Sequence, residues 1–373
     1  MIHDFAIIGA GMAGASLAAE LAPHARVLLL EAEAAPGYHA TGRSAAFWEE
    51  TYGGPGVVPL TRASGPYLAE HGFLTIRGAL YLGRAEDRAA LAAHRQTFTA
   101  AGVEIVPCEG KALSAMVPQL RPEWCLGLHQ PACADIDVAG LHQHYLARAR
   151  QHGAQLACRA EVTGLRRSGG VWQIATARGE NFAAAAIVNA AGAWADEVAV
   201  RAGASPIGLA PLRRTVVVLR VDPPAPADLP LVLDINGGFY FKPDAGRLWL
   251  SPHDEIPSAP CDAAPEELDV AVAIDRFEKV TQWRIAAVER RWAGLRSFAP
   301  DRLPAYGPDP EVPGFIWFAG QGGFGIQTAP AAARLTAQGL LGLGPDAMTA
   351  ALDREAYAPA RLLLQPGKQG LAL

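Results

Sequence analysis

The first 31 residues carry the pattern that most constrains how this chain folds. An apolar run, 5–8, leads directly into Gly9-Ala10-Gly11-Met12-Ala13-Gly14, and an Ala- and Leu-rich stretch, 15–21, follows. A second apolar run, 26–30, ends in Glu31. A buried strand, a glycine turn, a helix and a second strand in this order predict a βαβ unit, which belongs to a parallel sheet with helices on its faces.

The three glycines of this turn each have a physical role. The first permits a tight turn, the second lets the backbone approach a pyrophosphate, and the third lets the helix pack on the strand. The free N–H groups at the helix N-terminus bind the phosphates. Glu31 follows the glycine turn at the ~20-residue spacing of a ribose-binding carboxylate. Its negative charge would repel the 2′-phosphate of NADP, which argues against that cofactor. The pattern predicts a dinucleotide site, with FAD and NAD both open.

Composition narrows the class of protein. The chain has 373 residues, 50% of them hydrophobic, which is enough for a large core and for two domains. Its formal net charge of −5 argues against a nucleic-acid partner. The 5 cysteines are scattered and form no CxxC pair, so we predict neither a disulfide framework nor a metal site.

The chain shows no sign of a membrane or export segment. No basic region precedes its first apolar run, and no apolar stretch approaches the ~20 residues that cross a bilayer. We therefore expect a soluble, cytoplasmic protein with no membrane span.

Three later segments carry a resemblance to a known family. They are Pro36-Gly37-Tyr38-His39-Ala40-Thr41-Gly42-Arg43-Ser44-Ala45-Ala46, then Ile187-Val188-Asn189-Ala190-Ala191-Gly192-Ala193-Trp194, and finally Phe318-Ala319-Gly320-Gln321-Gly322-Gly323-Phe324-Gly325-Ile326-Gln327-Thr328. With the N-terminal motif they resemble the D-amino-acid oxidase (DAO) superfamily of FAD-dependent oxidoreductases. Within it the chain is most similar to the bacterial FAD-dependent D-arginine dehydrogenases.

The resemblance implies a flavoprotein that holds FAD without a covalent bond. The residues implied to bind it are Gly9, Gly11, Met12, Ala13, Gly14, Glu31, Gly42, Arg43, Ser44, Ala45, Ala46, Val162, Ala191, Gly192, Trp194, Gly322, Gly323, Phe324, Gly325, Ile326 and Gln327. From the residues alone, 42–46 also fits an ordinary loop, and 188–194 fits a plain core strand. The glycines of 320–325 precede a helical stretch from Thr328, whose N-terminal dipole suits an electron-rich flavin edge.

The predicted fold class is α/β, with a Rossmann-like FAD-binding domain and an α+β substrate domain whose sheet is mostly antiparallel. Strand-like runs at 215–221, 238–241 and 248–250 without intervening helices suit that second sheet. Because the flavin motifs recur along the chain, both domains are discontinuous. We assign 1–72, 136–202 and 298–373 to FAD binding, and 73–135 and 203–297 to substrate binding.

The resemblance also implies residues for an amino-acid substrate. Arg214 and Arg296 match carboxylate-binding arginines, whose planar forks bind both oxygens of a carboxylate. Tyr240 and Tyr52 match active-site tyrosines, and the Gly323 carbonyl matches an acceptor for the substrate amine. Surface arginines and packed aromatics are the ordinary alternatives, and the neighbouring Arg213 could replace Arg214.

The sequence departs from the D-arginine dehydrogenases in the side-chain pocket. Ala79 stands where they carry the glutamate that pairs with the substrate guanidinium, and Phe47 and Glu49 replace a histidine and a threonine. The side-chain preference is therefore expected to differ from D-arginine. Glu49 or Glu50 could restore an acid, but we favour a solvated loop for both.

The predicted function is oxidative deamination of a D-amino acid. Hydride leaves the substrate Cα for flavin N5, and the imino acid hydrolyses to a 2-oxo acid and ammonia. The alternatives are oxidation of a 2-hydroxy acid, cyclic imino acid or N-methyl amino acid, and a non-catalytic flavin-binding electron carrier. The electron acceptor and the oligomeric state stay open.

Overall fold

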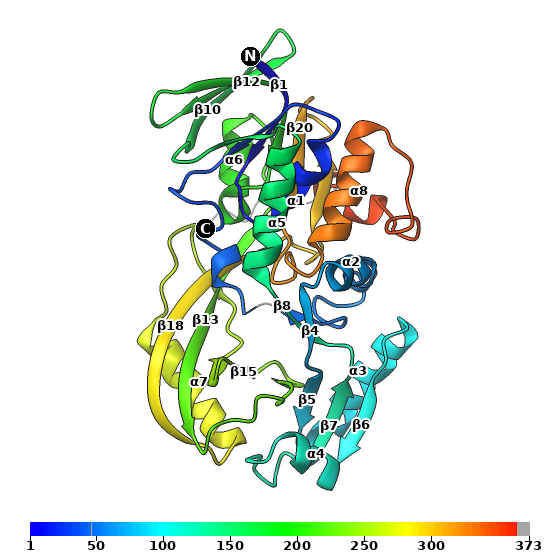
Figure 1. The fold of residues 1–373 in the computed structure, drawn as a ribbon, viewed down its shortest axis with the longest axis vertical. Helices are drawn as coiled ribbons and strands as arrows, with labels where there is room; N and C mark the ends of the chain where they lie inside the picture. Colours follow the sequence, from blue (N-terminus) through cyan, green and yellow to red (C-terminus); the bar gives the residue numbers. More distant parts are fainter. Residues whose placement is uncertain (46, 364–373) are drawn as a thin grey trace. The chain divides into compact units, whose positions relative to one another are not determined.

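The protein is described by a computed structural model that covers residues 1–45 and 47–363 (Figure 1). The chain divides into two compact units. Unit 1 consists of Met1–Gly42, Val138–Pro211 and the chain from Arg296 onward. Unit 2 consists of Arg43–Asp137 and Leu212–Leu295.

Unit 1 begins with the predicted βαβ unit. Strand β1 (Ile2–Ile8) enters the glycine turn, α1 (Met12–Leu21) follows, and β2 (Val27–Leu30) pairs with β1 in parallel register. The sheet has the order β10-β11-β12-β1-β2-β9. Strand β20 pairs with residues 187–189 of β12, beyond the stretch of β12 that pairs with β11, and β19 pairs with β20. The remaining strands are β9 (Gln155–Ala157), β10 (Val162–Ser168), β11 (Val171–Thr176), β12 (Asn181–Asn189), β19 (Ala305–Pro308) and β20 (Phe315–Ala319). Strands β20, β12, β1, β2 and β9 are parallel, and the β10–β11 hairpin is antiparallel.

Helices cover both faces of this sheet. Helix α1 lies beside α5 (Val138–Gln151) and α8 (Ala329–Leu341), as Figure 1 shows. The opposite face packs against α6 (Ala195–Arg201) and the β10–β11 hairpin, where Trp172 and Trp317 are buried. Side chains alternate between the two faces of the sheet along β1. Ala6 and Ile8 lie on the face that packs against α6, while Ile7 lies on the face that packs against α1.

Unit 2 is built on a nine-stranded sheet. Its order is β17-β13-β16-β15-β14-β5-β7-β6, with β18 on β13. The strands are β5 (Ala79–Gly83), β6 (Val106–Glu109), β7 (Leu126–Gln130), β13 (Ala210–Asp222), β14 (Leu231–Asp234), β15 (Tyr240–Asp244), β16 (Arg247–Ser251), β17 (Ile256–Pro257) and β18 (Arg284–Phe298). The β14–β5 pair is parallel, and the other pairs of described register are antiparallel. The predicted fold class is confirmed.

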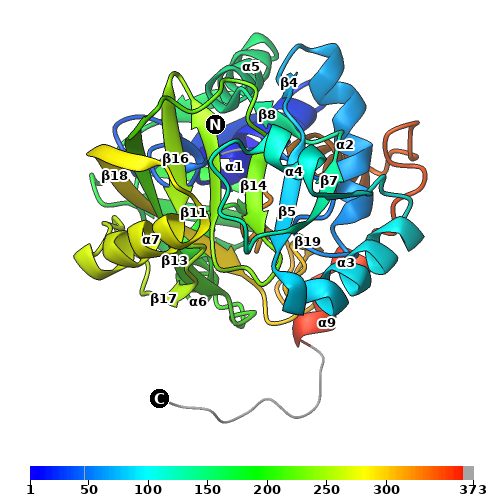
Figure 2. The same ribbon diagram turned by 90° about the horizontal axis from the view of Figure 1, so that it is seen from below.

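Shorter elements complete the two units. In unit 2, a small sheet has the order β3-β8-β4, and α7 (Glu267–Val280) packs on the large sheet near β13 and β18 (Figure 2). Its other elements are β3 (Phe47–Trp48), β4 (Leu74–Ile76), β8 (Ala134–Ile136), α2 (Val58–Glu70), α3 (Arg88–Ala100), α4 (Lys111–Met116) and the 3₁₀ turn Ala85–Asp87. Unit 1 adds α9 (Ala360–Leu363) and the 3₁₀ turns Gly192–Trp194 and Glu355–Tyr357.

Several boundaries of elements and domains differ from those predicted. Helix α1 begins at Met12 instead of residue 15, and the run 215–221 is the middle of the longer β13. Residues 43–72, which we assigned with the FAD-binding segments, lie in unit 2, and residues 203–211 lie in unit 1. The assignment of one unit to FAD and the other to substrate stays a prediction.

Over residues 1–45 and 47–363, the structure contains no helix long and apolar enough to cross a lipid bilayer.

The packing of α7 yields a stability prediction. Phe277 is fully buried, and its ring contacts those of Phe241 and Trp283 with centroids 5.3 and 6.2 Å away. Phe277→Ala should destabilise unit 2 by about 3–5 kcal/mol, because it removes buried apolar surface and leaves a cavity. Leu268→Ala in the same helix is the control, since Leu268 is 70% exposed. Thermal unfolding followed by circular dichroism should show a clear drop in Tm for the first variant only; equal Tm values would contradict this packing.

Candidate functional site

The glycine turn of unit 1 is too tight for any other residue at two positions. Gly9 has φ +100°, and a Cβ there would lie 2.4 Å from the Ala190 carbonyl oxygen. A Cβ on Gly14 would lie 1.8 Å from the Gly9 carbonyl oxygen. Both distances are far below van der Waals contact, so glycine is required for α1 to pack against β1 and the end of β12.

The N-terminus of α1 is open for an anion. Its N-cap residue, Gly11, makes no side-chain cap, and the Met12 N–H donates to Thr41 Oγ1 at 2.9 Å. Within the described part of the chain, no group accepts a hydrogen bond from the N–H of Ala13 or Gly14. These N–H groups and the helix dipole favour a phosphate. Thr41 was not among the predicted site residues, although it stands in the segment 36–46 that carried the resemblance.

Glu31 lies at the end of β2 and is 8% exposed. One carboxylate oxygen accepts the Ala10 N–H at 3.0 Å and the other accepts the Glu33 N–H at 3.0 Å. A carboxylate has further lone pairs, so Glu31 can still accept hydrogen bonds from ribose hydroxyls. The Ala160 N–H donates to the Glu31 carbonyl, which places the start of β10, where Val162 is buried, next to this acid.

A second turn of unit 1 follows β12. The Asn189 side chain donates to the Ala195 carbonyl at 2.7 Å and so fixes the turn that contains Ala191 and Gly192. Gly192 has φ +56°, with nothing within 4 Å of the place of a Cβ. The Trp194 ring lies 4.7 Å from that of His39, which in turn bonds Glu33 at 2.9 Å.

A third turn of unit 1 precedes α8. Gly322 has φ +51°, a Cβ there would lie 2.3 Å from the Phe298 ring, and its N–H donates to the Ser297 carbonyl at 2.9 Å. Phe324 and Gln327 are buried, while Gly323, Gly325 and Ile326 are partly exposed. The backbone of this turn is therefore held close to β18 by contacts that only glycine allows.

The first turn of unit 1 and Glu31 fit the dinucleotide part of FAD. They provide an uncapped helix N-terminus, two glycines at which a Cβ would collide with backbone atoms, and a buried acid directly after β2. These features match the pyrophosphate and ribose requirements of a dinucleotide. The role of each single residue stays a prediction.

The segment 42–46 is divided between the units. Gly42 ends the first stretch of unit 1, and Arg43 begins unit 2. The Arg43 guanidinium donates to the carbonyl oxygens of Ala263 (2.8 Å) and Ala293 (3.2 Å) and pairs with Asp262. The predicted contact between Arg43 and FAD would therefore be made by the backbone of Arg43.

The other predicted residues of this segment differ in surroundings. Ser44 is partly exposed, and Ala45 is buried in a cluster with Ala79 and Tyr240. Ala46 lies outside the described residues.

In unit 2, the structure brings together three of the predicted substrate residues. Arg214 on β13 is 6% exposed, and its guanidinium carbon lies 5.8 Å from the centroid of the Tyr240 ring. Phe47 lies between the two tyrosines, 5.9 Å from the Tyr240 centroid and 5.6 Å from that of Tyr52. We call Tyr240, Phe47 and Tyr52 the aromatic wall.

The charge of Arg214 is partly balanced inside unit 2. Its Nε donates to the Asp254 carbonyl at 2.7 Å, and the Asp254 and Glu255 carboxylates lie 3.6 and 3.7 Å away. The neighbouring Arg213 points to the other side of the strand and pairs with Glu266 and with Asp269 (2.9 Å). Arg213 is thus already bound to two acids, and which of the two arginines would meet a substrate carboxylate stays a prediction.

Arg296 and Gly323 belong to unit 1. The Arg296 guanidinium carbon lies 5.3 Å from the Phe298 ring centroid, and the residue is partly buried. That Arg214 and Arg296 share one carboxylate stays a prediction.

The expectation that Glu49 and Glu50 lie in a solvated loop is wrong. Glu49 is 0% exposed and Glu50 is 7% exposed. Thr51 donates to Glu49 Oε1 through its N–H (3.0 Å) and its hydroxyl (2.7 Å), and Tyr81 donates to Oε2 at 3.1 Å. Burial raises the pKa of Glu49 to about 7, against the lowering effect of these hydrogen bonds. The sequence held no signal for this, because Tyr81 is distant in the chain.

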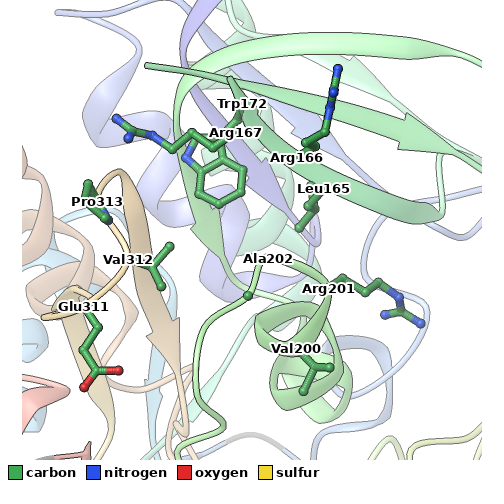
Figure 3. Close-up of a pocket in the computed structure, with 11 residues that line it drawn as sticks. Leu165, Arg166, Arg167, Trp172, Val200, Arg201, Ala202, Glu311, Val312 and Pro313 are labelled. Atoms are coloured by element: carbon green, nitrogen blue, oxygen red, sulfur yellow. The ribbon is translucent and has the colours of Figure 1, made fainter. Parts of the chain in front are cut away.

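Unit 1 also carries a surface hollow of about 460 Å³ between the β10–β11 hairpin, the end of α6 and the β19–β20 loop (Figure 3). Its lining includes Leu165, Val200 and Val312, and Figure 3 shows the side chains of Arg166 and Arg201 directed outward at its margin. None of the predicted FAD or substrate residues that the structure describes lines it.

The chain is similar to known proteins over most of its length. The family described as DAO, FAD dependent oxidoreductase, matches residues 4–339. The glycine oxidase of Geobacillus kaustophilus is 28% identical over 354 residues, covering 90% of this chain and 92% of that protein. The crystal structure of glycine oxidase from Geobacillus kaustophilus has a TM-score of 0.83 at 25% identity, covering 96% of this chain and 98% of that one.

Other relatives match in part or in fold. Dimethylglycine dehydrogenase of Mus musculus is 29% identical over 226 residues, which cover 54% of this chain. The chain spans only 25% of the length of that enzyme. The L-proline dehydrogenase of P. horikoshii shares the fold, with a TM-score of 0.84 at 23% identity over 97% of this chain and 98% of that one. The predicted special similarity to D-arginine dehydrogenases stays a prediction.

The glycine turn gives a test of cofactor binding. Gly9→Ala should lose most of the bound FAD, because the new Cβ would collide with the Ala190 carbonyl and displace the turn. Gly203→Ala is the control: Gly203 also has a positive φ, +76°, but no atom lies within 4 Å of its Cβ position. The ratio of flavin to protein absorbance in the purified variants measures the effect. Equal FAD content in the two variants would contradict a role for the turn.

Proposed function

Because this chain belongs to the DAO family of FAD-dependent oxidoreductases, we propose that it oxidises the Cα–N bond of a small neutral amino acid, either glycine or a D-amino acid. Bound FAD would accept the hydride from the substrate Cα. The resulting imino acid hydrolyses in water to a 2-oxo acid and ammonia. The amine must be neutral when the hydride leaves, because an ammonium has no lone pair to form the C=N bond.

The observation that carries this proposal is the burial of Arg214 against the aromatic wall. A buried guanidinium is costly unless anionic or carbonyl oxygens surround it, and an arginine fork binds a carboxylate with two parallel hydrogen bonds. Arg214 has a carbonyl partner at 2.7 Å, and the carboxylates of Asp254 and Glu255 lie 3.6 and 3.7 Å away. A substrate carboxylate would supply a bidentate partner, while Tyr240 and Tyr52 would pack on the substrate and donate their hydroxyls.

The acids near the wall explain the proposed preference for a neutral side chain. Ala79, fully buried, offers no charge. Asp135 is bonded to Lys242 at 2.7 Å and to Arg77 at 2.5 Å. The carboxylate of Glu49 is held by Thr51 and Tyr81, as described above. A cationic substrate side chain would therefore lack a dedicated anionic partner among these acids, and its desolvation would go uncompensated.

An N-methyl amino acid is the second candidate. The similarity to dimethylglycine dehydrogenase favours it, and a carboxylate clamp at Arg214 would serve such a substrate equally well. The product would then be an N-methylimine or its hydrolysis products instead of ammonia.

Substrate bleaching tests the function. The purified protein should be yellow, and in the absence of oxygen glycine or D-alanine should bleach its flavin absorbance, because a two-electron transfer reduces FAD. N-methylglycine, L-alanine, D-arginine and D-lactate complete the panel. Bleaching by N-methylglycine alone would select the second candidate. Bleaching by D-lactate alone, or by none of the panel, would overturn both.

The carboxylate role of Arg214 has its own test. Arg214→Lys keeps the charge but loses the planar fork, so KM for the bleaching substrate should rise about 10- to 100-fold, as expected for one lost charge-assisted hydrogen bond of about 1.5–3 kcal/mol. Arg220→Lys is the matched control, on the same strand but 54% exposed at its side chain and paired with Glu289. FAD content should stay unchanged in both variants. An unchanged KM in Arg214→Lys would remove this residue from the substrate site.

A further inference from the structure

The turn that follows β3 is organised around one buried carboxylate. The side chain of Glu49 accepts three hydrogen bonds, two from Thr51 and one from Tyr81. Thr51 is 4% exposed, and its hydroxyl also lies 2.7 Å from the Tyr81 hydroxyl. The three groups thus form a closed polar cluster, which we call the Glu49 cluster.

The Glu49 cluster is linked directly to the aromatic wall. Tyr52 follows Thr51 in the chain, and its N–H donates to the Glu49 carbonyl at 3.2 Å. On the other side of the tyrosine stand Gly53 and Gly54, with φ +99° and +82°. Glycines allow such backbone conformations, and the Gly54 N–H donates to the Thr51 carbonyl at 3.2 Å, which closes the turn on Thr51. The position of Tyr52 therefore depends on the end of the turn that Thr51 shares with the Glu49 cluster.

We propose that Glu49 is a positioning residue for substrate binding: its buried carboxyl group holds the turn 49–54 so that Tyr52 stays in the aromatic wall. This inference rests on the proposed function, because it assumes that the wall contacts substrate. Glu49 itself is fully buried and is not assigned any contact with substrate.

The protonation state of Glu49 decides how many hydrogen bonds the cluster can make. The protonated acid donates to one of the two hydroxyls and accepts from the Thr51 N–H and from the other hydroxyl, and the 2.7 Å contact between the hydroxyls then also carries a hydrogen bond. The ionised carboxylate accepts from all three donors and leaves no proton for the contact between the hydroxyls. Burial raises the pKa of Glu49 from 4.5 to about 7, so the folded cluster binds this proton more tightly than an exposed carboxyl group does. The turn is therefore expected to loosen as the pH rises from about 5 to about 7.

The other titratable groups around the Glu49 cluster are either neutral at the pH where Glu49 ionises or raise the pKa of Glu49 further. Tyr81 on β5 and Cys133, just before β8, both have pKa values raised by burial, so they stay neutral when Glu49 ionises. Glu50 adds a like charge that contributes to the raised pKa of Glu49, and Glu50 itself is paired with Arg62 at 3.3 Å. His94 packs on the Tyr81 ring, and burial lowers its pKa to about 4, so it too is neutral.

Hydrogen–deuterium exchange on the FAD-loaded protein tests the inference without any substrate. After correction for chemical exchange rates, the amides of residues 51–54 in the wild type should become less protected between about pH 5 and about pH 7. Glu49→Gln, which cannot ionise, should show no such change. Glu50→Gln is the matched control and should keep it. A wild-type protein without the change, or one in which Glu49→Gln keeps it, would overturn the proposal.

Kinetics then distinguish positioning from chemistry. With the amino acid that bleaches the flavin, Glu49→Ala, which removes the hydrogen-bond partner of Thr51 and Tyr81, should raise KM about tenfold and leave kcat within about twofold, as for an interaction that serves binding. Thr51→Val should act like Glu49→Ala, and Thr51→Ser, which keeps the hydroxyl, should act like the wild type. Loss of kcat with KM unchanged would overturn the proposal.

The two sets of measurements separate two failures. If no amino acid bleaches the flavin, the proposed function fails while the exchange result still reports on the turn. If amino acids bleach the flavin but the exchange shows no response, only the role of Glu49 fails.

Discussion

The approach of two backbone segments at the start of unit 1 is the constraint on which the cofactor site depends. Helix α1 packs so close to β1 that the α-carbon of Gly14 faces the Gly9 carbonyl, and Gly9 in turn faces the carbonyl of Ala190 at the end of β12. No Cβ fits at either position. Because α1 is held there, its free N–H groups lie at the carboxyl edge of the parallel strands, with Glu31 and Thr41 bonded to the same turn. This is the edge at which open α/β sheets bind their ligands.

In unit 2, charged side chains are buried together with the groups that form hydrogen bonds and ion pairs with them. Arg214, Lys242 and Glu49 are all buried, and each has oxygen or hydroxyl partners from other segments of unit 2. Such networks are costly to assemble, and removing one member leaves the others uncompensated. In the proposed function, the arrangement of these charges would set the substrate preference, because Arg214 lies beside the aromatic wall while Glu49 and Asp135 are already bonded. A common fold can serve different substrates through such local differences.

How much of the site the sequence could predict differs between the units. The motif that begins at Gly9 predicted the βαβ unit and the dinucleotide correctly, because every part of it is local and its glycines have no substitute. The later turns at Gly192 and Gly322 needed the family resemblance, since a glycine-rich stretch alone does not reveal which backbone it approaches. In unit 2, Arg214 was predicted just before a strand and lies within β13, and only the fold shows that Arg213 pairs with Glu266 and Asp269.

The sequence by itself determined the glycine turn, the acid that follows β2 and the order of strands and helices, because these depend on short-range geometry and on apolar periodicity. The tertiary structure decided the environment of the charged side chains. Glu49 was expected in solvent and is fully buried, since Thr51 and Tyr81 supply hydrogen bonds that no local pattern encodes. The boundary at residue 43 was also decided there, because Arg43 is held by residues more than two hundred positions away. Contacts between residues far apart in the chain produce no periodic pattern in a single sequence, so they cannot be predicted from it.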